Sequence, residues 1–101
     1  MWILRTIETG GGEGLTFRVM PGSMKTMGRA VRADFILDAP LVSRVHCRLS
    51  ATASGTLEVE DLKSTNGTFV NDRRVKRIAL VPGDKLRVGR VEMRVEREGQ
   101  Q

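Results

Sequence analysis

Cysteine and histidine are nearly absent from this sequence, which holds one of each, Cys47 and His46, among 101 residues. A single cysteine cannot form an internal disulfide, and this agrees with a reducing compartment. One cysteine and one histidine also exclude the usual zinc-binding sets. Ser43, His46 and Cys47 are close enough to suggest a nucleophile with its base, but no acidic residue occupies a recognisable position to orient the histidine. We therefore expect no enzyme activity, no metal site and no cofactor.

Long apolar runs are absent as well. None approaches the ~20 residues that a membrane-spanning helix requires, and the N-terminus lacks a basic segment followed by an apolar stretch. These absences predict a cytoplasmic protein that binds no membrane, unless a targeting segment was left off the chain. The composition, 40% hydrophobic and 29% charged, is typical of a folded soluble protein. The length of 101 residues suffices for one domain with one core.

Aromatic residues are scarce, and basic residues outnumber acidic ones by 17 to 12. The chain carries a formal charge of +5, and 13 of its 17 basic residues are arginine. Arginine suits phosphate because the guanidinium fork donates two parallel hydrogen bonds to an oxyanion, and it also suits nucleic acid. However, no block of five or six like charges occurs, and four aromatics without a tyrosine offer no stacking platform for bases. Charge alone leaves a phosphate binder, a nucleic-acid binder and an ordinary solvated surface open.

Short runs that alternate apolar and polar residues follow one another, separated by Gly and Pro turns. No window shows the i, i+3, i+4, i+7 spacing of an amphipathic helix, and strand-like runs recurring roughly every 8–12 residues favour an all-β sandwich or barrel. We predict about ten or eleven strands in two antiparallel sheets, one domain over residues 1–97, a flexible connection over 10–14 and a frayed tail over 98–101. Nine of these strands can be assigned to residues: Trp2 to Ile7, Leu15 to Val19, Met24 to Met27, Phe35 to Leu37, Cys47 to Ala51, Leu57 to Glu60, Arg77 to Val81, Lys85 to Val88 and Val91 to Glu96.

Hydrogen-bond donors gather in three predicted loops. These are Gly28-Arg29, then Ser43-Arg44-Val45-His46, and then Ser64-Thr65-Asn66-Gly67 with Asn71 beyond it. Asn66-Gly67 is a strong turn signal because both residues tolerate positive φ, so the chain is expected to reverse there. Together the clusters supply a guanidinium, hydroxyls and an amide but no carboxylate, which is a set suited to an anion.

Five motifs follow one another in a recognisable order and spacing: Gly28-Arg29, Asp34-Phe35-Ile36-Leu37-Asp38, Val42-Ser43-Arg44-Val45-His46, Asp61-Leu62-Lys63-Ser64-Thr65-Asn66-Gly67-Thr68-Phe69-Val70-Asn71, and Leu80-Val81-Pro82-Gly83-Asp84 with Leu86-Arg87-Val88-Gly89. In this arrangement the chain resembles the forkhead-associated (FHA) domain. The match extends from about Met24 to Val95, and Trp2 to Val19 fits the first two strands of that family. The resemblance implies an eleven-stranded β-sandwich of the FHA/SMAD-like type that binds phosphothreonine through loops at one end.

The resemblance also implies a role for individual residues. Phosphate contacts would come from Arg29, Ser43, Arg44 and Thr65, with Arg44 at the peptide-facing rim. Asn66 would bond the peptide backbone. Gly28, His46, Gly67 and Asn71 would support the site, His46 and Asn71 by bracing the binding loops with hydrogen bonds. Lys63 and Asp72 depart from the family at turn positions where glycine is frequent, and Lys63 suggests a preference for acidic residues in the ligand.

The function that the resemblance implies is a phosphothreonine-dependent signalling adaptor. Its partner would be a phosphothreonine-containing protein, either a Ser/Thr kinase or a substrate of one. An alternative is a protein-interaction domain that uses a sheet face and needs no phosphate. A basic nucleic-acid-binding module is less favoured because the aromatic residues are so few.

Overall fold

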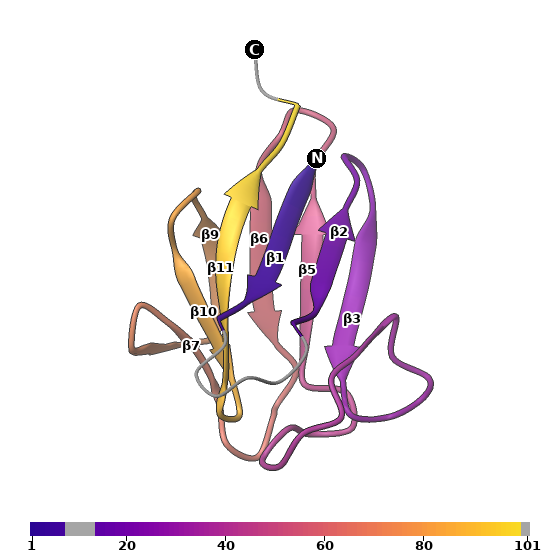
Figure 1. Ribbon diagram of the computed structural model, residues 1–101, viewed down its shortest axis with the longest axis vertical. Helices are drawn as coiled ribbons and strands as arrows, with labels where there is room; N and C mark the ends of the chain where they lie inside the picture. The colour runs from indigo at the N-terminus through magenta and orange to yellow at the C-terminus, as the bar shows by residue number, and fades with distance from the viewer. Residues whose placement is uncertain (8–13, 100–101) are drawn as a thin grey trace.

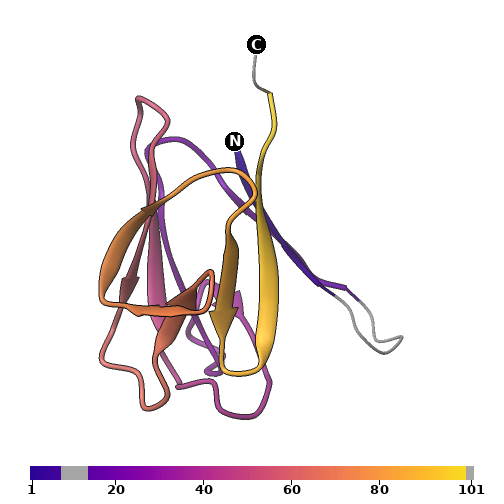
Figure 2. The same cartoon turned by 90° about the vertical axis from the view of Figure 1, so that its left-hand side faces the viewer.

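The computed structural model describes residues 1–7 and 14–99, which form eleven strands and no helix. The strands make two sheets packed face to face (Figures 1 and 2), which confirms the predicted all-β sandwich. No helix in the described part of the chain could therefore cross a membrane. Residues 10–13 of the predicted connection and 100–101 of the predicted tail lie outside the described residues. The strands are β1 (Trp2–Thr6), β2 (Thr16–Val19), β3 (Met24–Gly28), β4 (Phe35–Ile36), β5 (Cys47–Ala51), β6 (Leu57–Asp61), β7 (Thr68–Val70), β8 (Arg73–Val75), β9 (Arg77–Leu80), β10 (Lys85–Val88) and β11 (Val91–Arg97).

The six-stranded sheet has the order β2-β1-β11-β10-β7-β8, and the five-stranded sheet has the order β4-β3-β5-β6-β9. All neighbouring strands are antiparallel except β3 and β4, which pair in parallel, so the prediction of purely antiparallel sheets is wrong at this edge. Just before β4, the Asp34 carboxylate accepts hydrogen bonds from the Thr26 amide (2.9 Å) and hydroxyl (3.2 Å). These bonds bring the chain back beside the middle of β3, and β4 then runs forward along it.

The core lies between the sheets and is built by the alternation that the sequence displays. In β5, Cys47, Leu49 and Ala51 are buried, and in β11 Met93 and Val95 are buried in the same way. The outward positions carry charge, because water solvates them at little cost. At the end of β11, the Glu98 amide donates to the Met1 carbonyl (2.8 Å), so this residue of the predicted tail is paired with the start of β1.

The Asn66-Gly67 turn does not join two paired strands. It carries the chain from β6 in the five-stranded sheet to β7 in the six-stranded sheet. The tight hairpin comes later, between β7 and β8, where Asn71 and Asp72 have φ of 51° and 68°. Two consecutive residues with positive φ match the twist of a two-residue hairpin. Strands β7 and β8 fall outside the expected ranges, and Arg73-Arg74-Val75 of β8 has no apolar alternation.

The strands deliver the predicted donor loops to one end of the sandwich. In Figure 1 the connections β3–β4, β4–β5 and β6–β7 and the β10–β11 turn all lie at the lower end, away from the labelled chain termini. Loops that are far apart in the sequence thereby become neighbours, and side chains at their tips can face a common partner.

Replacing Asp72 by glycine tests the hairpin geometry. A side chain at positive φ costs up to about 1–2 kcal/mol, and glycine removes this cost at the expense of some backbone entropy. We expect Asp72→Gly to raise the free energy of unfolding by about 0.5–1 kcal/mol, measured by urea denaturation. Asp72→Asn removes only the exposed ion pair with Lys85 (3.3 Å) and should change little. A destabilised glycine variant would contradict the assigned strain.

Candidate functional site

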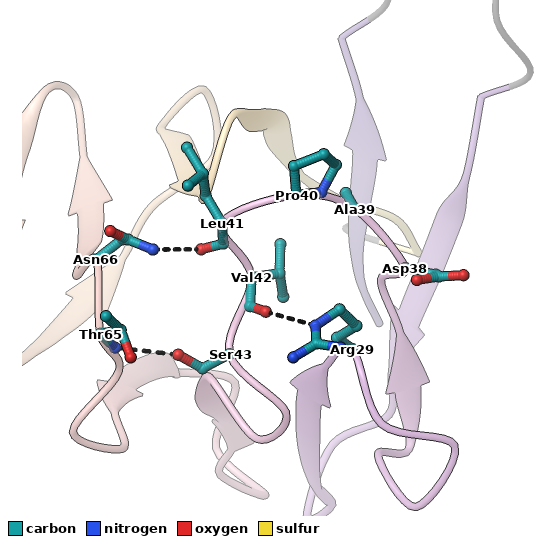
Figure 3. A pocket seen from close by; sticks show the side chains of 9 residues that line it. All are labelled: Arg29, Asp38, Ala39, Pro40, Leu41, Val42, Ser43, Thr65 and Asn66. Atoms are coloured by element: carbon teal, nitrogen blue, oxygen red, sulfur yellow. Dashed lines mark hydrogen bonds between the residues drawn. The ribbon is translucent and has the colours of Figure 1, made fainter.

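A hollow of about 530 Å³ lies at this loop end (Figure 3). It brings together Arg29 from the β3–β4 loop, Ser43 from the β4–β5 loop, and Thr65 and Asn66 from the β6–β7 loop. All four were expected to share a site, and the structure places them around one. The remaining lining residues are Asp38, Ala39, Pro40, Leu41 and Val42.

The β4–β5 and β6–β7 loops are joined directly by hydrogen bonds. The Leu62 amide donates to the His46 carbonyl (2.9 Å) and the Thr65 amide donates to the Ser43 hydroxyl (3.0 Å). The Asn66 side-chain amide donates to the Leu41 carbonyl (3.0 Å), as Figure 3 shows. These bonds set the spacing of the two walls of the hollow before any ligand arrives.

His46 adds a further bridge from underneath. Its side chain is completely buried, and its Nδ1 accepts from the Ser43 amide at 3.0 Å. Because Nδ1 is an acceptor, the neutral ring carries its proton on Nε2, which donates to the Gly67 carbonyl at 2.8 Å. Both ring nitrogens are thus used to join the loops. This arrangement agrees with a supporting role for His46.

Asp61 organises the β6–β7 loop at its base. Its carboxylate accepts hydrogen bonds from the hydroxyls of Ser64 (2.5 Å) and Thr68 (2.7 Å) and from the Ser64 amide (3.1 Å). The Ser64 hydroxyl also accepts from the Gly67 amide (2.9 Å). Partial burial raises the pKa of the Asp61 carboxyl, but the hydrogen bonds from Ser64 and Thr68 outweigh it, and the pKa is lowered overall.

Gly28 allows the β3–β4 loop to close on this assembly. A Cβ at this position would lie 2.1 Å from the Arg44 carbonyl oxygen, so only glycine fits. The close approach lets the Arg29 amide donate to the Ser43 carbonyl (2.9 Å) and the Ala30 amide donate to the Arg44 carbonyl (3.1 Å). Arg29 is therefore held against the β4–β5 loop by its own backbone.

The side chains that face the hollow keep donors for a ligand. Arg29 Nε donates to the Val42 carbonyl (3.1 Å), and within residues 1–7 and 14–99 its two terminal nitrogens have no hydrogen-bond partner. Ser43 accepts the Thr65 amide through its oxygen, so its hydroxyl proton stays available. Asp38 also lines the hollow, and although it belongs to one of the motifs it was not among the expected site residues. Figure 3 shows its side chain pointing away from the hollow.

Two predicted site residues lie elsewhere. Arg44 is exposed on the β4–β5 loop but does not line the hollow, so its expected contact with a ligand stays a prediction. Asn71 bonds Asp84 (3.0 Å) and the Lys85 amide (3.0 Å), and it therefore braces the β7–β8 hairpin against the start of β10. Neither of these partners belongs to a loop that lines the hollow, and the expected support of the site by Asn71 stays a prediction.

Some features of the site had no signal, or only a partial one, in the sequence. Leu41 adopts φ of 70°, which is rare for leucine, and its exposed side chain lines the hollow. Nothing in the residue types indicates this conformation. Lys63 and Asp72 also have positive φ, 57° and 68°, which explains why glycine suits these two turn positions.

Cys47 is buried beneath the site, and burial, reinforced by the nearby Asp61 carboxylate, raises the pKa of its thiol to about 12. Only the thiolate is a nucleophile. At neutral pH this cysteine is therefore a small core residue, and it provides no catalytic group for the hollow.

Comparison with known proteins gives a consistent result. The family model of the FHA domain matches residues 25–89. The chain is 39% identical over 79 residues to the ABC transporter ATP-binding/permease protein Rv1747 of Mycobacterium tuberculosis, covering 78% of this chain and 9% of that protein. It is 37% identical over 88 residues to the FHA domain-containing protein FhaA of the same organism, covering 87% of this chain and 16% of FhaA. The chain thus spans a small part of both relatives.

Solved structures agree with these matches. The FHA domain of FhaA, complexed with the intracellular domain of Rv3910, superposes with a TM-score of 0.83 at 32% identity, covering 95% of this chain and all of that one. A structure from a study of phosphothreonine-dependent FHA domain interactions superposes with a TM-score of 0.81 at 31% identity, covering 98% of each chain.

Removing the imidazole tests the bridge between the loops. His46→Ala leaves the Ser43 amide and the Gly67 carbonyl without a buried partner and opens a cavity. We expect the free energy of unfolding to fall by about 2–4 kcal/mol, measured by urea denaturation. The matched control is Val45→Ala at the exposed neighbouring position, which should change it by less than about 0.5 kcal/mol. Equal effects of the two substitutions would show that the bridge contributes little.

The lowered pKa of Asp61 predicts a pH dependence. The unfolded chain takes up this proton near pH 4 and the folded one only at lower pH, so the stabilisation is complete above about pH 4 and is lost as pH falls through the folded pKa. Asp61→Asn should lower the free energy of unfolding by about 1–2 kcal/mol at pH 7. The difference in this free energy between variant and wild type should become smaller in acid. A difference that stays constant from pH 7 to acid, in urea titrations at each pH, would contradict the assignment. Asp38→Asn is the control at an exposed aspartate.

Proposed function

This chain belongs to the forkhead-associated (FHA) domain family, and from that premise we propose that it is a phosphothreonine-dependent protein-binding module. One observation carries the proposal. Arg29, Ser43 and Thr65, from three separate loops, surround one hollow, and the carboxylate of Asp38 points away from it. Phosphothreonine carries nearly two negative charges and three strong acceptor oxygens. It therefore complements a hollow that offers donors and positive charge.

Each residue has a role in the proposed complex. The terminal nitrogens of Arg29 donate to phosphate oxygens, and such a charge-assisted bond contributes about 1.5–3 kcal/mol. The Ser43 hydroxyl donates a neutral bond worth about 1 kcal/mol, and Thr65 supplies a second hydroxyl. Asn66 uses its amide nitrogen to hold Leu41, which leaves its oxygen to accept a backbone N–H of the peptide. Arg44, exposed beside these groups, contacts the peptide from the rim.

The expected affinity is moderate and strongly dependent on the phosphate. An extended peptide buries little area and loses conformational entropy on binding, so we expect a micromolar dissociation constant. Dephosphorylation removes the acceptors that Arg29 and Ser43 require and should abolish most of the binding. A preference for threonine over serine depends on one methyl group and is limited to about 1–3 kcal/mol.

The relatives support a protein partner. FhaA is solved with the intracellular domain of Rv3910, and a second similar structure comes from work on phosphothreonine-dependent interactions. We propose a phosphothreonine-containing protein as the partner, either a Ser/Thr kinase or a kinase substrate, which places the chain in the cytoplasm. The domain then acts as an interaction module in signalling, without a catalytic step of its own.

Substituting Arg29 tests the proposal. Arg29→Ala should weaken binding to a phosphothreonine peptide, chosen from a degenerate library on the wild type, at least about tenfold, measured by fluorescence anisotropy. Arg29→Lys keeps the charge but not the guanidinium fork, so its affinity for the peptide should lie between those of the wild type and Arg29→Ala. The control is Arg32→Ala on the same loop, which should bind as wild type, and all variants should melt within a few degrees of it.

Two results would overturn the proposal. The first is equal affinity for the phosphorylated peptide and its dephosphorylated copy. The second is strong, salt-dependent binding of oligonucleotides without preference for phosphothreonine, which would favour the nucleic-acid alternative.

A further inference from the structure

A second hollow, of about 460 Å³, is lined in part by the same β6–β7 loop. Its walls come from the end of β6, the β6–β7 loop, and the segment that contains β8 and the start of β9. Four of its seven lining residues are basic. The full set is Glu60, Asp61, Lys63, Ser64, Arg74, Lys76 and Arg77.

The acidic groups of this second hollow already have partners within the protein. Asp61 accepts its three hydrogen bonds from Ser64 and Thr68. Glu60 is paired with Arg48 on the neighbouring strand. Both carboxylates keep their negative charge, but four basic residues against two acidic ones leave the hollow with an excess of cations.

Three of the four cations remain available. Arg77 is paired with Glu58 at 2.6 Å. Lys63, Arg74 and Lys76 are exposed, and within residues 1–7 and 14–99 none of them forms an ion pair. Three unpaired cations around one hollow favour an anion, since placing them together without one costs mutual repulsion.

The two hollows are adjacent because they share the β6–β7 loop. Lys63 and Ser64 line the second hollow, whereas Thr65 and Asn66, which follow directly, line the first. Arg74 lies across the loop, since a Cβ on Gly67 would be only 2.7 Å from its Nε. Two residues of chain span at most about 7 Å, and a lysine or arginine side chain adds several ångströms. An extended ligand rises about 3.3 Å per residue, so it bridges the two hollows within about two to five residues.

We propose that the second hollow is a subsite for a second anionic group, a carboxylate or a phosphate, carried by the same peptide two to five residues from its phosphothreonine. The inference rests on the proposed function, because the first hollow must hold the phosphothreonine. It assigns Lys63, Arg74 and Lys76 as specificity-determining residues. The preferred partner segments are then acidic or multiply phosphorylated beside the bound threonine.

The test is a series of peptides in which one negative charge is moved from position to position. A phosphothreonine peptide with neutral flanks receives a single glutamate at each position from five before to five after the phosphothreonine, and a second series receives a second phosphothreonine. Anisotropy titrations of the wild type should show a preferred position at which glutamate tightens binding about threefold to tenfold, and the second phosphate more. High salt should reduce this gain, because exposed ion pairs are screened.

Matched variants locate the effect. In Lys63→Gln/Lys76→Gln the gain at the preferred position should vanish, while the neutral-flanked peptide binds as before. In Lys63→Glu/Lys76→Glu the same position should prefer lysine. The control Arg18→Gln changes an exposed cation on β2, far along the chain from both hollows, and should keep the gain. Circular dichroism melts confirm that each variant folds.

The outcomes separate the two proposals. If the neutral-flanked phosphothreonine peptide binds but no position prefers glutamate, the subsite does not exist and the proposed function stands. A gain that persists in Lys63→Gln/Lys76→Gln, or that is lost equally in Arg18→Gln, also overturns the subsite, since the gain then comes from overall charge. If the phosphothreonine peptide does not bind at all, both proposals fail.

Discussion

The imidazole of His46 is the contact on which the rest of the site depends. It is fully buried, and it joins the Ser43 amide on one loop to the Gly67 carbonyl on another. In the described part of the chain the only other buried polar side chains are Ser64 and Thr68, and both bind the Asp61 carboxylate at the base of the same loop. No buried side-chain nitrogen or oxygen there lacks a partner. The buried polar groups are thus all used to fix the geometry of the binding loops.

This arrangement separates support from recognition. Backbone groups and buried side chains make the bonds between the loops, which leaves terminal donors of Arg29, Ser43 and Thr65 facing the hollow. A site that is already in place loses little entropy in ordering itself, so more of the interaction energy appears as affinity. Part of the formal charge of +5 is concentrated at the two hollows. These two hollows, each lined by arginine or lysine, share one loop, although the sequence contains no block of like charges.

Much of the fold was predictable because the residues of a strand point alternately into the core and into solvent, so every second residue is apolar. All the expected strands are present, and the residues expected to bind a ligand include four of the five polar residues that line the hollow. Local sequence is ambiguous about the partners of a turn. The Asn66-Gly67 turn leads from one sheet into the other, and Asn71 bonds Asp84 and Lys85 at the start of β10. A turn motif predicts that the chain bends, but it does not predict which strand the next segment pairs with.

By itself, the sequence determined the sandwich, its buried positions and the donor set, since alternation, glycine placement and residue chemistry are local properties. Tertiary structure alone decided which groups became neighbours. The Asp34 carboxylate bonds the Thr26 amide beside the parallel pair β3 and β4, Leu41 adopts a positive φ and lines the hollow, and the β6–β7 loop contributes residues to two hollows. Each of these depends on hydrogen bonds between segments distant in the chain, and no local pattern encodes their partners.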